Sequence, residues 1–158
     1  MTPPRLTRRL RAALELVPEE ATAVADVGAG HGALSAHLAA TRSVIATEAQ
    51  PGPYAELCRN LRAWSATDRV DAREGSGLAP LSEGEVDAVV VAGVSARTAQ
   101  CICDAAAEKR VRWLVLQCVQ HPEQVEPWLA RRGWPVRQRI DVLQRGRTYA
   151  TWLVEVCA

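Results

Sequence analysis

The feature that most constrains the fold is a glycine-rich segment near the N-terminus, residues 26–32 with the sequence DVGAGHG. It follows a short apolar run, residues 21–27, which predicts a strand. It precedes Leu34, His37 and Leu38, whose spacing predicts a helix. Glycines at a strand-to-helix junction allow a tight turn and a close approach of ligand to backbone, and the helix N-terminus offers free N–H donors. We therefore expect a βα unit that binds a nucleotide-like ligand, although a single glycine would suffice for the turn alone.

The rest of the chain alternates between helical and strand patterns. Residues 87–92 are almost wholly apolar, as expected of a central parallel strand covered on both faces. Helices are expected over residues 6–17, 34–38, 54–64, 96–108 and 123–131, and further strands over residues 44–47, 69–73, 111–117, 135–143 and 148–156. The last two strands flank Arg145-Gly146-Arg147, which is typical of a hairpin turn. The pattern predicts an α/β fold with a doubly wound, mostly parallel seven-stranded sheet and an antiparallel C-terminal hairpin. Such sheets bind ligands beyond the carboxyl ends of their strands.

Composition favours one globular domain over residues 1–158. Hydrophobic residues make up 48% of the chain and charged residues 23%, and 158 residues are enough to bury a sizeable core. No apolar run approaches the roughly 20 residues that a bilayer requires. The first residues do not resemble a secretory signal. We expect a soluble, cytoplasmic protein with no membrane partner.

The five cysteines do not predict a disulfide framework, because their number is odd and no export signal precedes them. We expect them to be small core residues. Cys101 and Cys103 are two residues apart on a predicted helix, where side chains do not face each other, and tetrahedral zinc needs four convergent donors. Cys118 and His121 do not complete such a set, so no metal is expected.

Basic residues are almost all arginine, 18 of 19, in a chain of net charge +1. They cluster in two stretches: Arg5, Arg8, Arg9 and Arg11, then Arg131, Arg132, Arg137, Arg139, Arg145 and Arg147. Arginine forks fit phosphate, but clustered charges are also common on solvated faces, and both interpretations stay open. Trp64, Trp128 and Trp134 have a similar ambiguity between stacking on RNA bases and packing in the core.

Two classes of cofactor compete for the glycine-rich segment. Gly28, Gly30 and Ala33 satisfy the dinucleotide fingerprint G-x-G-x-x-G/A, and Glu48 lies at about the right distance to bind ribose hydroxyls. This pattern fits a nicotinamide-dependent oxidoreductase. With Asp26, however, the segment resembles the first motif of class I S-adenosylmethionine-dependent methyltransferases. A carboxylate there would repel a pyrophosphate and attract the methionyl ammonium, and we therefore favour S-adenosyl-L-methionine as the cofactor.

Taken in order, motifs along nearly the whole chain resemble the TrmK family, bacterial methyltransferases that act on N1 of adenine 22 in tRNA. The motifs are Arg9-Leu10, Asp26-x-Gly28-x-x-His31, Gly52-Pro53-Tyr54, Gly75-Ser76-Gly77-Leu78, Glu85-Val86-Asp87, Val91-Ala92-Gly93, Leu116-Gln117, Gly133-Trp134 and Tyr149. The resemblance implies the Rossmann-like class I methyltransferase fold, an RNA substrate, and the activity of an S-adenosylmethionine-dependent tRNA adenine-N1 methyltransferase.

The resemblance also implies roles for individual residues. Asp26, Gly28, Ala29 and Gly30 would hold the methionyl part of the cofactor, and Glu48 and Ala49 the ribose; Gly75, Ser76 and Gly77 would border the adenine, and Ala92 and Gly93 would line the reacting end. His31 and Arg9 are the candidate catalytic residues on the substrate side. His31 would hydrogen-bond the base or only shape the loop, and Arg9 would clamp a phosphate or the cofactor carboxylate or lie on a helix surface.

The sequence departs from the family around the expected target base. Gly30 stands where the family has an acidic residue, Val94-Ser95-Ala96 replaces Met-Gly-Gly, and Cys118-Val119 replaces Pro-Asn. Ser76 replaces Asn or Asp. The family's C-terminal coiled-coil region has no counterpart before Ala158, so we expect a partner or self-association to replace it. We hypothesise a methyltransferase with an intact cofactor cleft and altered target selection. The alternatives are a non-catalytic or retargeted cofactor-binding homologue and, less favoured, a nicotinamide-dependent oxidoreductase.

Overall fold

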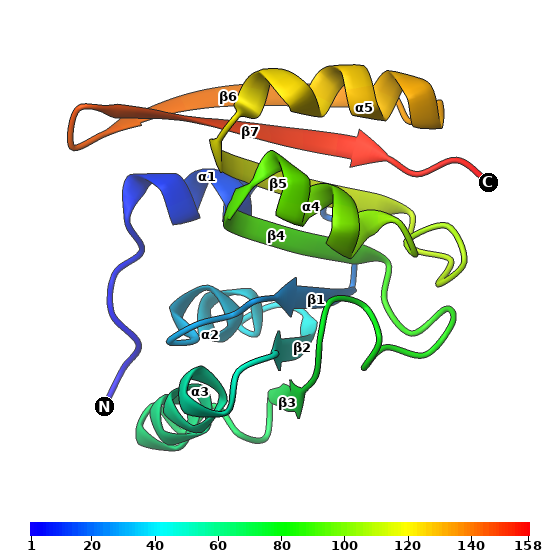
Figure 1. The fold of residues 1–158 in the computed structure, drawn as a ribbon. Helices are drawn as coiled ribbons and strands as arrows, with labels where there is room; N and C mark the ends of the chain where they lie inside the picture. Colours follow the sequence, from blue (N-terminus) through cyan, green and yellow to red (C-terminus); the bar gives the residue numbers. More distant parts are fainter.

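The computed structural model describes all 158 residues and contains one seven-stranded sheet in the order β3-β2-β1-β4-β5-β7-β6 (Figure 1). The elements are α1 (Arg8–Leu16), β1 (Ala23–Val27), α2 (Ala33–Leu38), β2 (Ser43–Glu48), α3 (Pro51–Ala63), β3 (Val70–Glu74), β4 (Ala88–Ser95), α4 (Ala96–Cys103), β5 (Trp113–Gln120), η1 (Pro122–Gln124), α5 (Val125–Arg132), β6 (Val136–Gln144) and β7 (Arg147–Glu155). The predicted fold class and the predicted antiparallel hairpin are confirmed.

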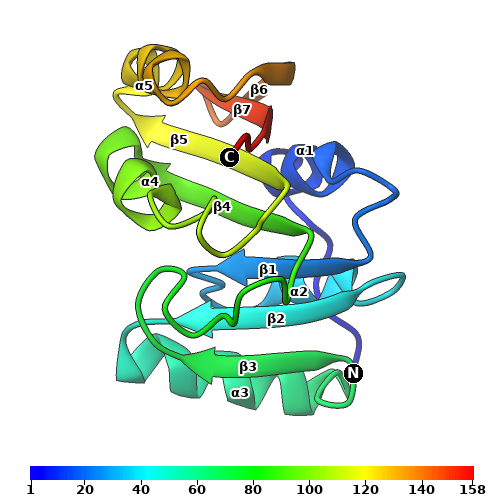
Figure 2. The ribbon, with the colours of Figure 1, turned by 90° about the vertical axis from the view of Figure 1, so that its right-hand side faces the viewer.

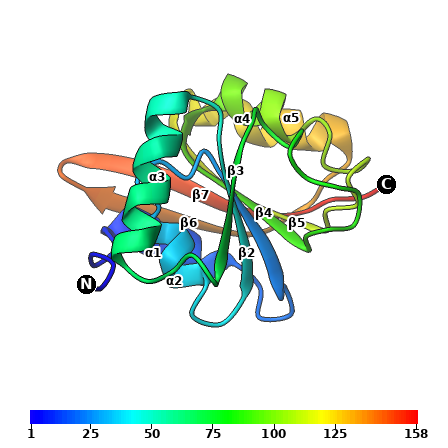
Figure 3. The ribbon, with the colours of Figure 1, turned by 90° about the horizontal axis from the view of Figure 1, so that it is seen from below.

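Helices cover both faces of the sheet: α4 and α5 lie on one side, and α1, α2 and α3 on the other (Figure 3). Strand β4 shows why the sequence requires two layers. Val89 and Val91 belong to the core cluster beneath α4 and α5, whereas Ala88 and Val90 belong to the cluster beneath the other three helices. Because side chains alternate along a strand, an entirely apolar strand must be covered on both faces.

The strand order reverses between β1 and β4, and this reversal positions the glycine-rich segment. Strands β1 to β5 run parallel, so their carboxyl ends share one edge of the sheet (Figure 2). From β1 the chain crosses to β2 on one side, whereas β4 pairs on the other side. Such a switch point leaves a crevice outside the carboxyl ends, and residues 28–32 lie there between β1 and α2.

The C-terminal hairpin extends past its neighbouring strand. Strand β5 pairs with β7 up to Cys118 and Ala150, and β6 continues to pair with β7 for three more residues, as far as Gln144 and Arg147. Helix α1 packs against this projecting part, and the backbone N–H of Arg9 donates to Gln144 Oε1 at 3.1 Å. The hairpin turn therefore lies at the same edge of the sheet as the glycine-rich segment.

Two predicted boundaries are wrong in the middle of the chain. Strand β4 runs on to Ser95, because a left-handed Gly93 absorbs an irregularity, and pairing with β5 resumes at Val94 and Cys118 and ends at Ser95 and Gln120. Helix α4 ends at Cys103 rather than at residue 108. The carbonyl of Asp104 accepts a hydrogen bond from Arg132 of α5, and turns follow in which Lys109 Nζ donates to the carbonyl of Leu81.

The cysteines and tryptophans divide by burial. All five cysteines are free thiols, and only Cys103 and Cys118 are buried, so the expectation of core positions is wrong for the exposed Cys101 and Cys157. Burial raises the pKa of the Cys118 thiol to about 12. Trp128 and Trp134 pack edge to face in the core with ring centroids 5.9 Å apart, which confirms packing for these two. None of the helices combines the length and the apolar character needed to cross a membrane.

Candidate functional site

The glycine-rich segment is tied to β2 and leaves open space on its outer side. The N–H groups of Gly28 and Ala29 both donate to the carbonyl of Thr47 at 3.0 Å. Gly28 and Gly30 have φ values of +73° and +57°, and a Cβ at either position would meet no atom within 4 Å. Left-handed backbone favours glycine, and the empty space beside it is what a ligand lying against the backbone requires.

A cavity of about 370 Å³ opens between this segment and α4. Its walls come from the ends of β1, β2 and β3 and from one face of α4: Val27, Gly28, Thr47, Glu48, Ala49, Gly75, Ser76, Gly77, Arg97, Thr98, Cys101 and Ile102. The hydroxyl of Thr47 is buried here without a hydrogen-bond partner. Buried polar groups are normally paired, so this hydroxyl is an exception in the wall of the cavity. We call this space the larger cavity.

A second space of about 150 Å³ lies on the other side of the same segment, towards α1. It is lined by Arg9, Leu10, Asp26, Gly28, Ala29, Gly30, His31, Leu34 and Ala92. Gly28 lines both spaces, so they are neighbours separated only by the loop backbone. We call this space the smaller cavity.

Asp26 is the buried charge of the smaller cavity. It is 4% exposed, and the hydroxyl of Ser35 donates to its Oδ2 at 2.6 Å. Burial raises the pKa of Asp26 to about 6 from its ordinary 3.8; the Ser35 hydrogen bond opposes this rise, and the nearby charge of Glu48 adds to it. Oδ1 makes no hydrogen bond within the protein. A buried carboxylate with a free oxygen facing a cavity fits a cationic ligand group.

Glu48 connects the two spaces. It lines the larger cavity, and its Oε1 accepts a hydrogen bond from the N–H of Gly30, which lines the smaller one, at 2.8 Å. Oε2 has no partner within the protein and can accept from a ligand hydroxyl.

Arg9 is held at the mouth of the smaller cavity by three groups. Its Nη1 donates to Gln117 Oε1 at 3.2 Å, and its guanidinium carbon lies 5.8 Å from the centre of the Tyr149 ring. The buried Gln117 also donates to the carbonyl of Arg9 and to Thr151 Oγ1, both at 2.8 Å. A Cβ at Gly93 would lie 3.1 Å from Arg9 Nη1, so the absence of a side chain there leaves room for the guanidinium.

His31 is exposed, and its ring caps the start of α2. The N–H of Ala33 donates to His31 Nδ1 at 3.2 Å, and Asn60 Nδ2 donates to the carbonyl of His31 at 2.8 Å. A ring nitrogen that accepts a hydrogen bond carries no proton, so this geometry selects the neutral tautomer with its proton on Nε2. The loop-shaping role is therefore present in the structure, and Nε2–H remains available as a donor.

The structure brings every predicted site residue to one edge of the sheet. It also brings two of the sequence departures together, because Val94 pairs with Cys118 on neighbouring strands. Several residues of the site were not predicted from the sequence. They are Ser35, Thr47 and Gln117, and the residues that α4 contributes: Arg97, Thr98, Cys101 and Ile102. Thr47 could have been predicted, because it directly precedes the predicted Glu48. Nothing in the sequence of α4 indicates that the helix lines a cavity.

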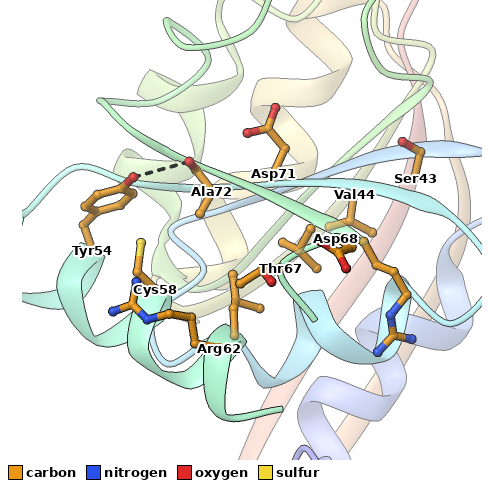
Figure 4. A pocket seen from close by; sticks show the side chains of 12 residues that line it. Ser43, Val44, Tyr54, Cys58, Arg62, Thr67, Asp68, Asp71 and Ala72 are labelled. Carbon is orange, nitrogen blue, oxygen red and sulfur yellow. Dashed lines mark hydrogen bonds between the residues drawn. The ribbon is translucent and has the colours of Figure 1, made fainter. Parts of the chain in front are cut away.

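A third cavity of about 490 Å³ lies between α3 and β3 (Figure 4). Tyr54, Cys58 and Arg62 of α3 line one side, and the hydroxyl of Tyr54 donates to the carbonyl of Ala72 at 3.4 Å. Ser43 and Val70, the first residues of β2 and β3, also line it. It therefore lies towards the amino ends of the strands, and none of the predicted site residues belongs to it.

The strand order and the glycine-rich loop after β1 define a Rossmann-like α/β protein with its ligand site at the topological switch point. A family model described as a methyltransferase domain matches residues 6–151, and the chain therefore belongs to the methyltransferase domain family.

Individual relatives agree with this family. The tRNA (adenine(22)-N(1))-methyltransferase of Bacillus subtilis is 25% identical over 156 residues, which are 96% of this chain and 65% of the relative. The chain thus spans just under two thirds of the length of that protein. A Streptococcus pneumoniae protein, Sp1610, in complex with S-adenosyl-L-methionine superposes with a TM-score of 0.89 at 25% identity, over 96% of this chain and 73% of its own. M. capricolum TrmK in complex with S-adenosyl-homocysteine shares the fold, with a TM-score of 0.85 at 17% identity over 95% of this chain and 68% of its own.

Proposed function

We propose that the protein is an S-adenosylmethionine-dependent methyltransferase that modifies N1 of an adenine in tRNA. The observation that carries the proposal is the free oxygen of the buried Asp26 in a cavity that adjoins, across Gly28, a second cavity beside Glu48. A ligand with an ammonium at one end and a nucleoside at the other fits this pair. Membership of the methyltransferase family and the Bacillus subtilis relative support the reaction and the substrate.

The cofactor would lie across the loop. Asp26 would hold the methionyl ammonium, and Glu48 Oε2 would accept from the ribose hydroxyls. The adenine would enter the larger cavity between the Gly75-Ser76-Gly77 backbone and Ile102 of α4, with the Thr47 hydroxyl at its wall. Arg9 lies where it can meet the methionyl carboxylate from the opposite side of the smaller cavity.

When bound, the cofactor supplies an electrophilic methyl group on a sulfonium. The residues of the site would hold adenine N1, which carries a lone pair, against this methyl group. Methyl transfer to N1 would require positioning and exclusion of water more than a strong base. His31 Nε2–H would donate to the incoming base, and Ala92 and Gly93 would form the wall beside the reacting carbon.

A missing carboxylate does not prevent this chemistry. Gly30 removes a carboxylate that the family places before the histidine, but N1 of neutral adenine already carries the lone pair, and the proton lost later from the methylated base can leave to solvent. The positions Val94 and Cys118 border the carboxyl ends of β4 and β5. We assign them to the choice of target base. As a tRNA-modifying enzyme the protein would act in the cytoplasm.

The oxidoreductase alternative fits the site less well. A dinucleotide pyrophosphate against residues 28–30 would place two negative charges beside Asp26 and Glu48, and the charge of Glu48 already raises the pKa of Asp26.

The first test is a calorimetric titration with S-adenosyl-homocysteine, with NADH as the control ligand. We expect micromolar binding of the former and none of the latter. The second test incubates the protein with S-adenosylmethionine and an unmodified tRNA transcript and measures 1-methyladenosine by mass spectrometry after digestion. A transcript with guanine at position 22 is the matched control. Binding without methylation of tRNA or of total small RNA would favour a non-catalytic homologue, and binding of NADH alone would refute the proposal.

A further inference from the structure

Two groups of exposed arginines, one on α5 and β6 and the other on α1 and the hairpin turn, differ in their partners. The first group, Arg131, Arg132, Arg137 and Arg139, lies on α5 and β6 and is largely neutralised. Arg137 pairs with Glu155 at 2.6 Å, Arg139 with Asp141 at 3.1 Å, and Arg132 with Asp104 at 3.7 Å. Arg132 and Arg139 also lie over the rings of Trp134 and Trp152 at 4.4 and 5.3 Å. We call this group the paired cluster.

The second group consists of Arg8 and Arg11 on α1 and Arg145 and Arg147 at the hairpin turn, and we call it the arginine edge. All four are exposed, and none forms an ion pair with a carboxylate. The acidic residues of the same elements do not neutralise them: Glu15 is four residues after Arg11 on α1 but forms no ion pair with it, and Asp141 is bonded to Arg139. The arginine edge therefore carries uncompensated positive charge.

The fold places the arginine edge on α1 and the hairpin turn, the two elements that meet at Arg9 beside the smaller cavity. Arg8 and Arg11 are three residues apart and share one side of α1, whose Arg9 is bonded to Gln144 at the end of β6. Arg147 pairs with Gln144 across the hairpin and is two residues from Tyr149, which contacts Arg9, so its side chain is on the α1 side of the hairpin. Figure 1 shows the hairpin turn projecting beside the start of α1.

We infer that the arginine edge is the surface that binds the RNA phosphate backbone, and that the paired cluster is not. This inference rests on the proposed function, because it assigns the contact surface for that RNA. A free guanidinium can place its fork on a phosphate at once, whereas each member of the paired cluster that already holds a carboxylate must first release it. The arginine edge also lies on the same two elements as Arg9 and its partner Gln144, and Arg9 lines the cavity through which a target base would reach the methyl group.

The test compares two quadruple variants with the same change in charge. One carries Arg8→Gln, Arg11→Gln, Arg145→Gln and Arg147→Gln; the control carries Arg131→Gln, Arg132→Gln, Arg137→Gln and Arg139→Gln. Affinity for an unmodified tRNA transcript is measured by filter binding between about 50 and 200 mM salt. Each lost phosphate contact lowers the slope of log K against log salt by about 0.7 to 0.9. We expect the first variant to lose about three units of slope and on the order of 10- to 100-fold in affinity at about 100 mM salt, and the control less than about threefold.

Equal losses in the two variants, or no loss in the first, would overturn the inference. Titration with S-adenosyl-homocysteine and a thermal melt establish that each variant is folded and retains its cofactor cleft, since Arg9 is unchanged in both. If the unsubstituted protein binds S-adenosyl-homocysteine and methylates tRNA while the first variant binds tRNA normally, only the surface assignment fails. If the unsubstituted protein binds no cofactor, the proposed function fails, and the salt dependence of RNA binding still decides between the two surfaces.

Discussion

The two cavities on either side of the glycine-rich loop are built on different principles. The larger is formed by strand ends, backbone at Gly75 and Gly77, and the side of α4, with Glu48 and Arg97 at its margins. The smaller is less than half its volume, about 150 against 370 Å³, and holds the opposed charges of Asp26 and Arg9. The larger cavity can select a ligand by shape and the smaller by charge. Under the proposed function, one loop therefore recognises two chemically different ends of a single ligand.

We expect the largest loss of cofactor affinity when the charge of Asp26 is removed. Asp26→Asn keeps the side-chain shape and an acceptor for Ser35 but removes the charge opposite the ligand ammonium. Hydrogen bonds to charged groups contribute about 1.5–3 kcal/mol, so the Kd for S-adenosyl-homocysteine should rise by on the order of 100-fold. Calorimetry measures this, with the exposed Glu56→Gln on α3 as the control. An unchanged Kd would mean that the smaller cavity does not bind the ammonium.

The same substitution should stabilise the free protein at neutral pH. Because the pKa of Asp26 is about 6 when folded and 3.8 ordinarily, the unfolded chain loses the proton first as pH rises. Ionisation of Asp26 therefore opposes folding increasingly between about pH 4 and 6, by up to about 3 kcal/mol above that range. Urea unfolding of Asp26→Asn and the unsubstituted protein should give equal stability near pH 4 and a gap that widens to pH 7. A difference in stability that does not change with pH would show that it does not come from the ionisation of Asp26.

Ligand binding in the larger cavity should be more sensitive to added side-chain volume than to a change of side-chain charge. In Gly75→Ala the new Cβ would overlap Cγ of Pro80, a rigid ring that cannot turn away. We expect a loss of about 1–3 kcal/mol of stability and roughly tenfold weaker binding of adenosine-containing ligands, a shift of about 1.4 kcal/mol. Gly52→Ala is the matched control, because a Cβ there meets nothing within 4 Å. Thermal melts measure the stability of the two variants, and calorimetry measures their affinity for the ligand. Equal stability and equal affinity in the two variants would refute the steric argument.

The smallest effect should come from restoring the family's residue at the rim of the larger cavity. Ser76 is exposed and makes no side-chain hydrogen bond within the protein. Asn at this position can reach the edge of an adenine, and one added neutral hydrogen bond contributes about 0.5–1.5 kcal/mol. Ser76→Asn should therefore bind S-adenosyl-homocysteine about three- to tenfold more tightly. Weaker binding would place the adenine elsewhere.

The sequence predicted the fold well because its signals are local. The central strands β1, β2, β4 and β5 are short and largely apolar, and glycines follow β1, β3 and β6, so the order of elements and the hairpin at Arg145-Gly146 could be predicted directly. The start of α4 at Ala96 was predicted correctly, but the end of β4 was placed too early because Gly93 resembles a strand end, whereas in the structure it is an irregularity inside a longer strand. Tertiary pairing with Gln120 decides that point, and no local pattern reports it.

The site was predicted unevenly for the same reason. Asp26 and Glu48 lie in the last two residues of β1 and β2, and Gly28 and Gly75 follow β1 and β3, so their shared edge follows from the parallel sheet. Thr98 and Ile102 reach the larger cavity only because the crossover from β4 to β5 lays α4 beside it. The ion pairs that distinguish the paired cluster from the arginine edge likewise join residues far apart in the sequence, such as Arg137 and Glu155.

The near absence of lysine determines how this protein can be regulated. Lys109 is the only lysine, and its amine is bonded to the carbonyl of Leu81. Arginine keeps its proton at any physiological pH, and acetyl groups are transferred to lysine rather than to guanidinium. The positive surface around the site is therefore permanent. Changes in cellular pH and lysine acetylation leave it unaltered, and ionic strength is the variable that tunes its attraction for a polyanion.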